Sequence, residues 1–257
     1  MPLFKQFRVF VLVLILLGVS VEALLTRNHL QDWSSTLNVA IFPINGDGSA
    51  ESRSFINSLK EADFAPIEQY FGEQAAQYGL AQTRPIRIYL GSEIQKHPPE
   101  KPAKAGFFSS IYWSLAMRYW VRRNTPSIHV RPDIRIFALY FDPAKYKRLP
   151  DSTGLAKGQI GMAYLFADRG LNGSNLLVTT HEMLHTLGAT DKYGLQTNQP
   201  IFPVGYAEPY KSPRYPQEFA EIMAGRVPMS ETEANIPESV QKTMIGFVTA
   251  REIRWIK

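Results

Sequence analysis

Apolar and polar positions repeat along the chain with two different periods. Short apolar runs with strand character occur at residues 37–44, 85–91, 133–142 and 158–167. Apolar positions at helical spacing fall between or after these runs, at 52–60, 64–78, 107–123, 175–187 and near 249–256. Because predicted strands and helices alternate without an evident linker, we expect one α+β domain over residues 37–257, with a twisted mixed sheet and packing helices.

The amino terminus has a different pattern. Lys5 and Arg8 precede an apolar run from Val9 to Val21, and Ala23 lies close behind it. This order is typical of a signal anchor or signal peptide, although the run is shorter than the roughly 20 residues of a membrane span. We therefore predict an apolar anchor helix over 1–25 and a polar spacer over 26–36.

The charges around that run also predict an orientation. Positive residues before the apolar run favour a cytoplasmic amino terminus and an exported domain. The expected location is extracytoplasmic, anchored by the amino-terminal helix in a bacterial inner membrane and facing the periplasm. Secretion after cleavage of the signal is the alternative.

Composition narrows the chemistry. The chain has 257 residues, of which 45% are hydrophobic and 20% charged, which is enough apolar material for a buried core. The net charge of +5 is spread over scattered Lys and Arg, so we expect no nucleic-acid partner. The chain has no cysteine, which excludes disulfides, a cysteine nucleophile and thiolate metal ligands. Any metal must be held by nitrogen and oxygen.

One stretch carries candidate chemistry, NLLVTTHEMLHTLGATDKYG at 175–194. On a helix, His181 and His185 lie about 40° apart around the axis, so both imidazoles can reach one ion. Glu182 points about 100° away and is placed to accept a proton from a water molecule rather than to be a ligand beside both histidines. The pattern His-Glu-x-x-His is that of zinc hydrolases, and imidazole nitrogen suits Zn²⁺.

The surroundings of the motif favour a metal over the plainer interpretation. Leucines and methionine flank it, and burial of two histidines and a glutamate without a partner would be costly. The alternative is a solvent-facing or hydrogen-bonded pair of histidines. A catalytic zinc needs a third ligand. Gly188 can end the helix and turn the chain so that Asp191 faces the metal, while Glu221 and Glu218 are rival ligands further along.

With these residues in view, the sequence resembles a known family. HEMLHTLGATD is similar to the metzincin motif His-Glu-x-x-His-x-x-Gly-x-x-His, with Asp191 in place of the last histidine, as in the snapalysin-like branch. The resemblance implies a zincin fold with Tyr193 near the transition state and Met223 in a methionine turn. Packing roles are the alternatives for both residues. The HTLGATDKY and AEIMAGR stretches also resemble a group of membrane-anchored bacterial proteins.

These observations predict a function. We expect a zinc-dependent metalloendopeptidase in which His181, His185 and Asp191 hold Zn²⁺, Glu182 is the general base, and the substrate is a protein or peptide. The strand near 158–166 is expected to pair with that substrate as an edge strand. The alternative is a membrane-anchored zinc-binding interaction module without turnover. The substrate's identity is not encoded in a recognisable motif.

Overall fold

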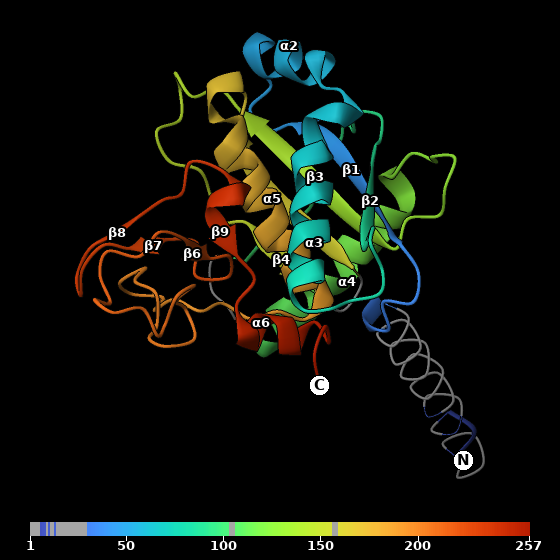
Figure 1. Ribbon diagram of the computed structural model, residues 1–257. Coiled ribbons are helices and arrows are strands. Elements are labelled where there is room, and N and C mark those ends of the chain that lie inside the picture. The colour runs from blue at the N-terminus through green and yellow to red at the C-terminus, as the bar shows by residue number, and fades with distance from the viewer. Residues whose placement is uncertain (1–5, 9, 11–12, 14–29, 103–105, 156–158) are drawn as a thin grey trace.

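A five-stranded sheet forms the centre of the protein (Figure 1). The computed structural model describes residues 6–8, 10, 13, 30–102, 106–155 and 159–257. The strand order is β2-β1-β3-β5-β4, and all pairs are parallel except β4 with β5. The strands are β1 (Leu37–Asn45), β2 (Ile86–Leu90), β3 (Ile134–Phe141), β4 (Thr153–Leu155) and β5 (Ile160–Phe166).

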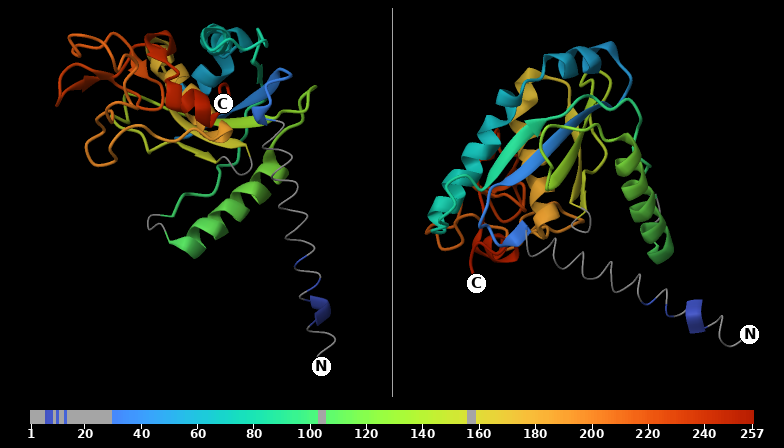
Figure 2. Two further views of the ribbon diagram at one scale, coloured as in Figure 1. Left: turned by 60° about the horizontal axis from the view of Figure 1, so that its bottom comes forward. Right: turned by 90° about the vertical axis from the view of Figure 1, so that its right-hand side faces the viewer.

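Helices cover both faces of this sheet (Figure 2). One face carries α2 (Ala50–Ser58), α3 (Ala65–Gln77) and α5 (Asn172–Leu187), and the other carries α4 (Phe107–Asn124). Alternate residues of β1 therefore enter two separate cores. Val39 and Ile41 pack toward α3 and α5, while Phe42 packs in the cluster that contains Trp113 and Met117 of α4. Burial on both faces explains why the strands are nearly continuous apolar runs.

The expected fold class was wrong in two respects. The architecture is α/β rather than α+β, because the crossovers β1 to β2 and β2 to β3 pass through helices and join parallel strands. The individual strand and helix predictions in this half were confirmed to within a few residues, but β4 was missed. Its three residues form the antiparallel edge, so β5 is an interior strand and the predicted role of 158–166 as substrate-pairing edge was wrong.

The second correction concerns the amino terminus. Most of residues 1–25 lie outside the described residues, and the part of the chain that is described contains no helix with the length and apolar character to cross a membrane. The predicted anchor helix, and with it the placement in the inner membrane facing the periplasm, is therefore withdrawn. The apolar run from Val9 to Val21 is also shorter than the roughly 20 residues that a membrane-spanning helix needs.

The predicted spacer also differs where it is described. Leu30, Gln31 and Trp33 are buried rather than solvated. The Trp33 indole N–H donates to the Ile253 carbonyl at 2.7 Å, and its ring packs edge-on against Trp255. Residues 30–36 are thus part of the folded domain and fix its carboxyl-terminal end.

The chain after α5 is largely irregular. Two small sheets pair β6 (Ala220–Glu221) with β9 (Thr243–Met244) and β7 (Val227–Pro228) with β8 (Ala234–Asn235), and α6 (Phe247–Glu252) follows. The proline- and tyrosine-rich segment before β6 is held by side chains. The hydroxyls of Tyr206 and Tyr215 are 2.8 Å apart, and Arg214 lies over the ring of Phe202.

Candidate metal site

Helix α5 positions the two motif histidines. Its apolar side, including Leu177, Met183 and Leu184, is buried in the core, which fixes the rotation of the helix. His181 and His185 then lie next to each other on the opposite side, with ring centroids 4.7 Å apart. Ligand-type atoms of His181, Glu182 and His185 all lie within 4.8 Å of one another, the one such group among the residues described.

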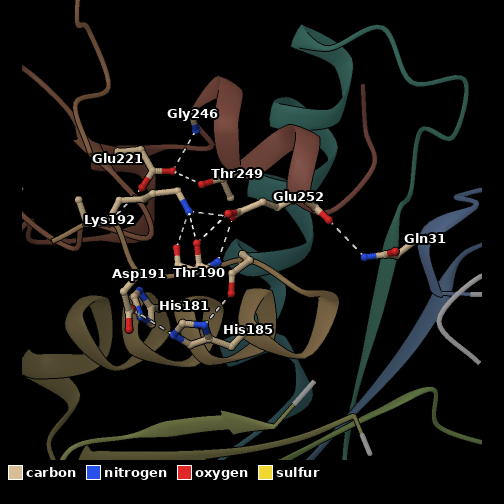
Figure 3. A network of polar contacts seen from close by, with 12 residues as sticks. Gln31, His181, His185, Thr190, Asp191, Lys192, Glu221, Gly246, Thr249 and Glu252 are labelled. Carbon is tan, nitrogen blue, oxygen red and sulfur yellow. Dashed lines mark hydrogen bonds and ion pairs between the residues drawn. The ribbon is translucent and has the colours of Figure 1, made fainter. Parts of the chain in front are cut away.

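Gly188 brings a third side chain to this pair. It ends α5 in the left-handed conformation, with φ of 104°, which glycine adopts without strain. The chain turns back, and Asp191 Oδ1 reaches 3.1 Å from His181 Nε2 and 3.2 Å from His185 Nε2 (Figure 3). The side chains of His181, His185 and Asp191 are 13%, 18% and 33% exposed, so the site is open to solvent.

The other nitrogen of each imidazole is already engaged. His181 Nδ1 lies 3.0 Å from the Ile222 carbonyl, and His185 Nδ1 lies 2.9 Å from the Ala189 carbonyl. A carbonyl only accepts, so each Nδ1 carries the proton and each Nε2 of a neutral ring presents a lone pair. Hydrogen bonds of this kind orient metal-bound histidines.

Three lone-pair atoms therefore face one another. Asp191 Oδ1 lies 3.1 and 3.2 Å from the two Nε2 atoms, and these lone pairs repel unless a positive charge sits between them. Zinc bonds of about 2.0–2.1 Å in a tetrahedron place neighbouring ligand atoms about 3.3 Å apart. The observed spacing is close to that value. The donor set, its spacing and its hydrogen bonds all fit Zn²⁺ held by His181, His185 and Asp191.

The electrostatics agree with this fit. Burial lowers the pKa of His181, but the hydrogen bond and charge of Asp191, together with Glu182, raise it overall. Burial raises the pKa of Asp191, but the two histidines lower it well below its usual range. The site thus favours a cation next to an ionised carboxylate.

Glu182 lies beside this group without being satisfied by the protein. It is 4% exposed, and its Oε2 has no hydrogen-bond partner among the described residues. Burial raises the pKa of Glu182, and the charges of His181 and His185 offset only part of that rise. An unpartnered buried carboxylate oxygen is costly, so it marks a place where a ligand or water is expected to bind.

Two glycines allow the sheet edge to approach the site. Gly154 of β4 is paired with Gly161 of β5. A Cβ on Gly154 would lie 2.3 Å from His185 Cβ and 2.7 Å from the Glu182 carbonyl oxygen. A Cβ on Gly161 would meet Ile136, with Glu182 just beyond. The strand edge therefore runs directly against the turns of α5 that carry the motif.

The two supporting residues that the resemblance implied lie near the site. The hydroxyl of Tyr193 interacts with the Asp191 carboxylate, and burial followed by the charges of Asp191 and Glu182 raises the pKa of Tyr193. Met223 is fully buried, and its carbonyl accepts the Lys192 N–H at 3.0 Å. The preceding carbonyl, that of Ile222, is the one bonded to His181. The Met223 segment therefore lies beside the first histidine.

The rival third ligands lie elsewhere. Glu221 is fully buried, and its carboxylate accepts from the Ala224 amide, the Gly246 amide and the Thr249 hydroxyl. The side chain of Glu218 is 70% exposed and pairs with Lys211. Of the three candidates, Asp191 alone lies within contact distance of both histidines.

Sequence reasoning missed the residues that hold the ligands. These are the carbonyls of Ala189 and Ile222, together with Gly154, Lys192 and Glu252, the last two described below. Backbone carbonyls leave no sequence signal, and Glu252 is far from the motif along the chain. The sequence offered one usable signal, the charge of Lys192 directly after Asp191, which indicates a nearby acidic partner.

Comparison with known proteins adds no assignment. No protein-family model matches the chain, and no curated protein matches it significantly.

Proposed function

We propose that the protein is a zinc-dependent peptidase. The observation that carries the proposal is that Asp191 Oδ1 lies within 3.2 Å of both His181 Nε2 and His185 Nε2, next to the buried Glu182, whose Oε2 has no partner among the described residues. Zinc bound there would supply a Lewis acid that polarises a carbonyl and lowers the pKa of water. The resemblance of this site to the metzincin motif supports the same reaction class.

Glu182 is the general base of this proposal. Its raised pKa, caused by burial, makes its carboxylate a better proton acceptor than a solvated glutamate. It takes a proton from the attacking water and then delivers it to the leaving amine. Tyr193, held near Asp191, is placed to donate a hydrogen bond to the carbonyl oxygen as negative charge develops there.

The peptide is expected to bind along β4. This strand is the edge of the sheet, and its free backbone groups can pair with an extended substrate. The close approach of Gly154 to His185 supports this, since a peptide paired with β4 would lie near the proposed metal ligands. The substrate class is therefore an extended peptide or an unfolded protein segment.

The zinc-binding module without turnover receives less support. A structural zinc site is closed by four protein ligands, whereas three residues converge here and the site keeps access to solvent. Glu182 is also left without a structural partner for its Oε2 among the described residues.

The test compares the full-length protein with Glu182→Gln. Zinc content is measured by elemental analysis, and hydrolysis by a quenched fluorescent library of random peptides. We expect one zinc per chain in both proteins and a loss of about 10²–10⁴-fold in kcat/KM for Glu182→Gln. Zinc in both without hydrolysis by the wild type would favour the interaction module. Equal hydrolysis by both would refute the role of Glu182.

A further inference from the structure

The turn that carries Asp191 is bonded to the last helix of the protein (Figure 3). Glu252, at the end of α6, accepts hydrogen bonds from the residue before Asp191. The Thr190 amide donates to Glu252 Oε2 at 3.0 Å, and the Thr190 hydroxyl donates to Oε1 at 2.7 Å. Both carboxylate oxygens of one side chain therefore hold the residue that directly precedes the third candidate ligand.

The residue after Asp191 is held by the same carboxylate. Lys192 Nζ donates to Glu252 Oε2 at 2.8 Å, to the Thr190 carbonyl at 2.6 Å and to the Thr190 hydroxyl at 2.8 Å. These three acceptors match the three protons of an ammonium group. The Lys192 side chain is only 4% exposed, so loss of its carboxylate partner would leave a buried and unpaired charge.

Helix α6 is itself fixed against the end of the motif helix. Gln31 Nε2 donates to the Leu187 carbonyl at 2.6 Å and to the Glu252 carbonyl at 3.2 Å. Buried Glu221 accepts from Gly246 and Thr249 at the other end of α6. Helix α6 is therefore bonded at one end to the Asp191 turn and at the other end to Glu221, next to the Ile222 carbonyl that orients His181.

Residues 189–192, which form the turn, belong to no helix or strand. In the main chain, the Ala189 N–H donates to the Leu184 carbonyl, the Lys192 N–H donates to the Met223 carbonyl, and the Lys192 carbonyl accepts from the Ile201 N–H. The Asp191 carboxylate must nevertheless stay close to two imidazoles. Glu252 adds side-chain bonds to the residues on both sides of it, Thr190 and Lys192.

We propose that Glu252, acting with Lys192, is a positioning residue for Asp191, so that α6 is a required part of the metal site. This inference rests on the proposed zinc function. Glu252 has no contact with the histidines and no role in the chemistry. It bonds to the Thr190 amide and hydroxyl on one side of the ligand and to the Lys192 ammonium on the other, as outer residues do for metal ligands elsewhere.

The experiment uses the full-length protein and the conservative variant Glu252→Gln. The glutamine amide has the shape of the carboxylate, but an NH₂ group replaces one of the two oxygens. That NH₂ group cannot accept hydrogen bonds from Thr190 or Lys192. Thr190→Val is a milder second variant that removes the two bonds of the Thr190 hydroxyl, to Glu252 and from Lys192, and keeps the Glu252 carboxylate. Zn²⁺ affinity is measured by competition with a chromophoric chelator, and site geometry by the visible absorption of bound Co²⁺.

Asp63→Asn is the matched control. Asp63 is 23% exposed against 25% for Glu252, and it too accepts from a backbone amide, that of Lys60, and from a cation, Arg169, each at 2.8 Å. It lies between α2 and α3 and makes no contact with the site. Glu252→Gln should lower the melting temperature at least as much as Asp63→Asn, because the cation that it leaves, Lys192, is 4% exposed, whereas Arg169 is 46% exposed.

A positioning role predicts a difference in the metal readouts. We expect Glu252→Gln to weaken Zn²⁺ binding by about 10–100-fold and to alter the Co²⁺ spectrum. Thr190→Val should lie between it and the wild type, and Asp63→Asn should match the wild type. Equal Zn²⁺ affinity and an unchanged Co²⁺ spectrum in Glu252→Gln, with only a lower melting temperature, would overturn the proposal.

A metal-free measurement separates this inference from the proposed function. Amide hydrogen exchange is followed at Lys192, whose N–H bonds to Met223 rather than to Glu252. Faster exchange there in metal-free Glu252→Gln than in Asp63→Asn supports the positioning role, and equal exchange refutes it. If the wild type binds no zinc, the proposed function fails, and the exchange result alone decides whether Glu252 holds the turn.

Discussion

Replacement of Gly154 by alanine tests the contact between the edge strand and the motif helix. The new Cβ would lie 2.3 Å from His185 Cβ and 2.7 Å from the Glu182 carbonyl oxygen, whereas carbon atoms pack at about 3.5–4.0 Å. The strand or the helix must therefore move by roughly 1 Å. The helix is fixed by buried Met183 and Leu184, so we expect β4 to yield.

The cost follows from overpacking. Forced shifts of this kind in packed regions cost about 1–3 kcal/mol. Chemical denaturation should show a decrease of that size in the free energy of unfolding, with an unchanged denaturant slope. Displacement of β4 should also raise the KM for peptides more than it lowers kcat, because β4 is the strand proposed to bind the substrate, while the two histidines stay on α5.

Gly72→Ala is the control for this substitution. Gly72 lies in α3, and the nearest atom to a Cβ there is the Thr83 carbonyl oxygen at 3.3 Å. Its small steric cost is offset by the helix preference of alanine, so stability should change by less than about 1 kcal/mol. A Gly154→Ala protein as stable as Gly72→Ala, with unaltered KM, would show that the close approach of β4 to α5 is not required.

Three further outcomes are expected. Asp191→Ala should weaken Zn²⁺ binding by more than about 100-fold in a chelator competition, while Glu218→Ala, altered at an exposed side chain, should leave it unchanged; equal affinities would exclude Asp191 as a ligand. Removal of zinc with a chelator should lower the melting temperature by an amount that grows with the zinc concentration of the reference sample, since a ligand that binds only the folded state stabilises it by mass action; a calorimetric midpoint independent of zinc would contradict this. Partial burial raises the pKa of Asp47, but hydrogen bonds from Ser49 and the Asp142 amide outweigh it and lower the pKa to about 2. The ionised carboxylate therefore stabilises the fold above the unfolded pKa of 3.8, and this contribution is lost as the pH falls toward 2. Because Asp47 is partly exposed, Asp47→Asn should cost no more than about 1 kcal/mol at pH 6 in urea titrations, and this cost should shrink as the pH falls through 2. A cost that does not shrink would refute the linkage.

Local patterns predicted most of the elements that surround the site. Strands β1, β3 and β5 are largely apolar runs, and their burial on two faces makes the signal strong, while the shorter edge strand β2 alternates around exposed Arg87. The three residues of β4 are too few to give a period. Their omission led to the incorrect assignment of β5 as the edge, so the edge strand beside the motif helix could be identified only from the sheet order.

The amino-terminal predictions failed for a related reason. Apolar character alone predicted an anchor over 1–25 and polarity alone predicted a spacer over 26–36. Whether Trp33 and Gln31 are solvated depends on partners at Ile253 and Leu187, which lie more than 150 residues away in the sequence. Composition does not report such contacts.

The sequence by itself determined the chemistry of the site. His181 and His185 lie on one side of α5 because four residues make about one helical turn, and Gly188 ends that helix because it tolerates a positive φ. Only the tertiary structure showed that Asp191, rather than Glu218 or Glu221, lies beside both histidines, and it alone brought Lys192 to Glu252 and the Ile222 carbonyl to His181. The physical reason is range. Helical spacing and turn conformation act over a few residues, whereas the contacts that orient and hold the ligands close loops of 41 and 60 residues and form only when the whole domain packs.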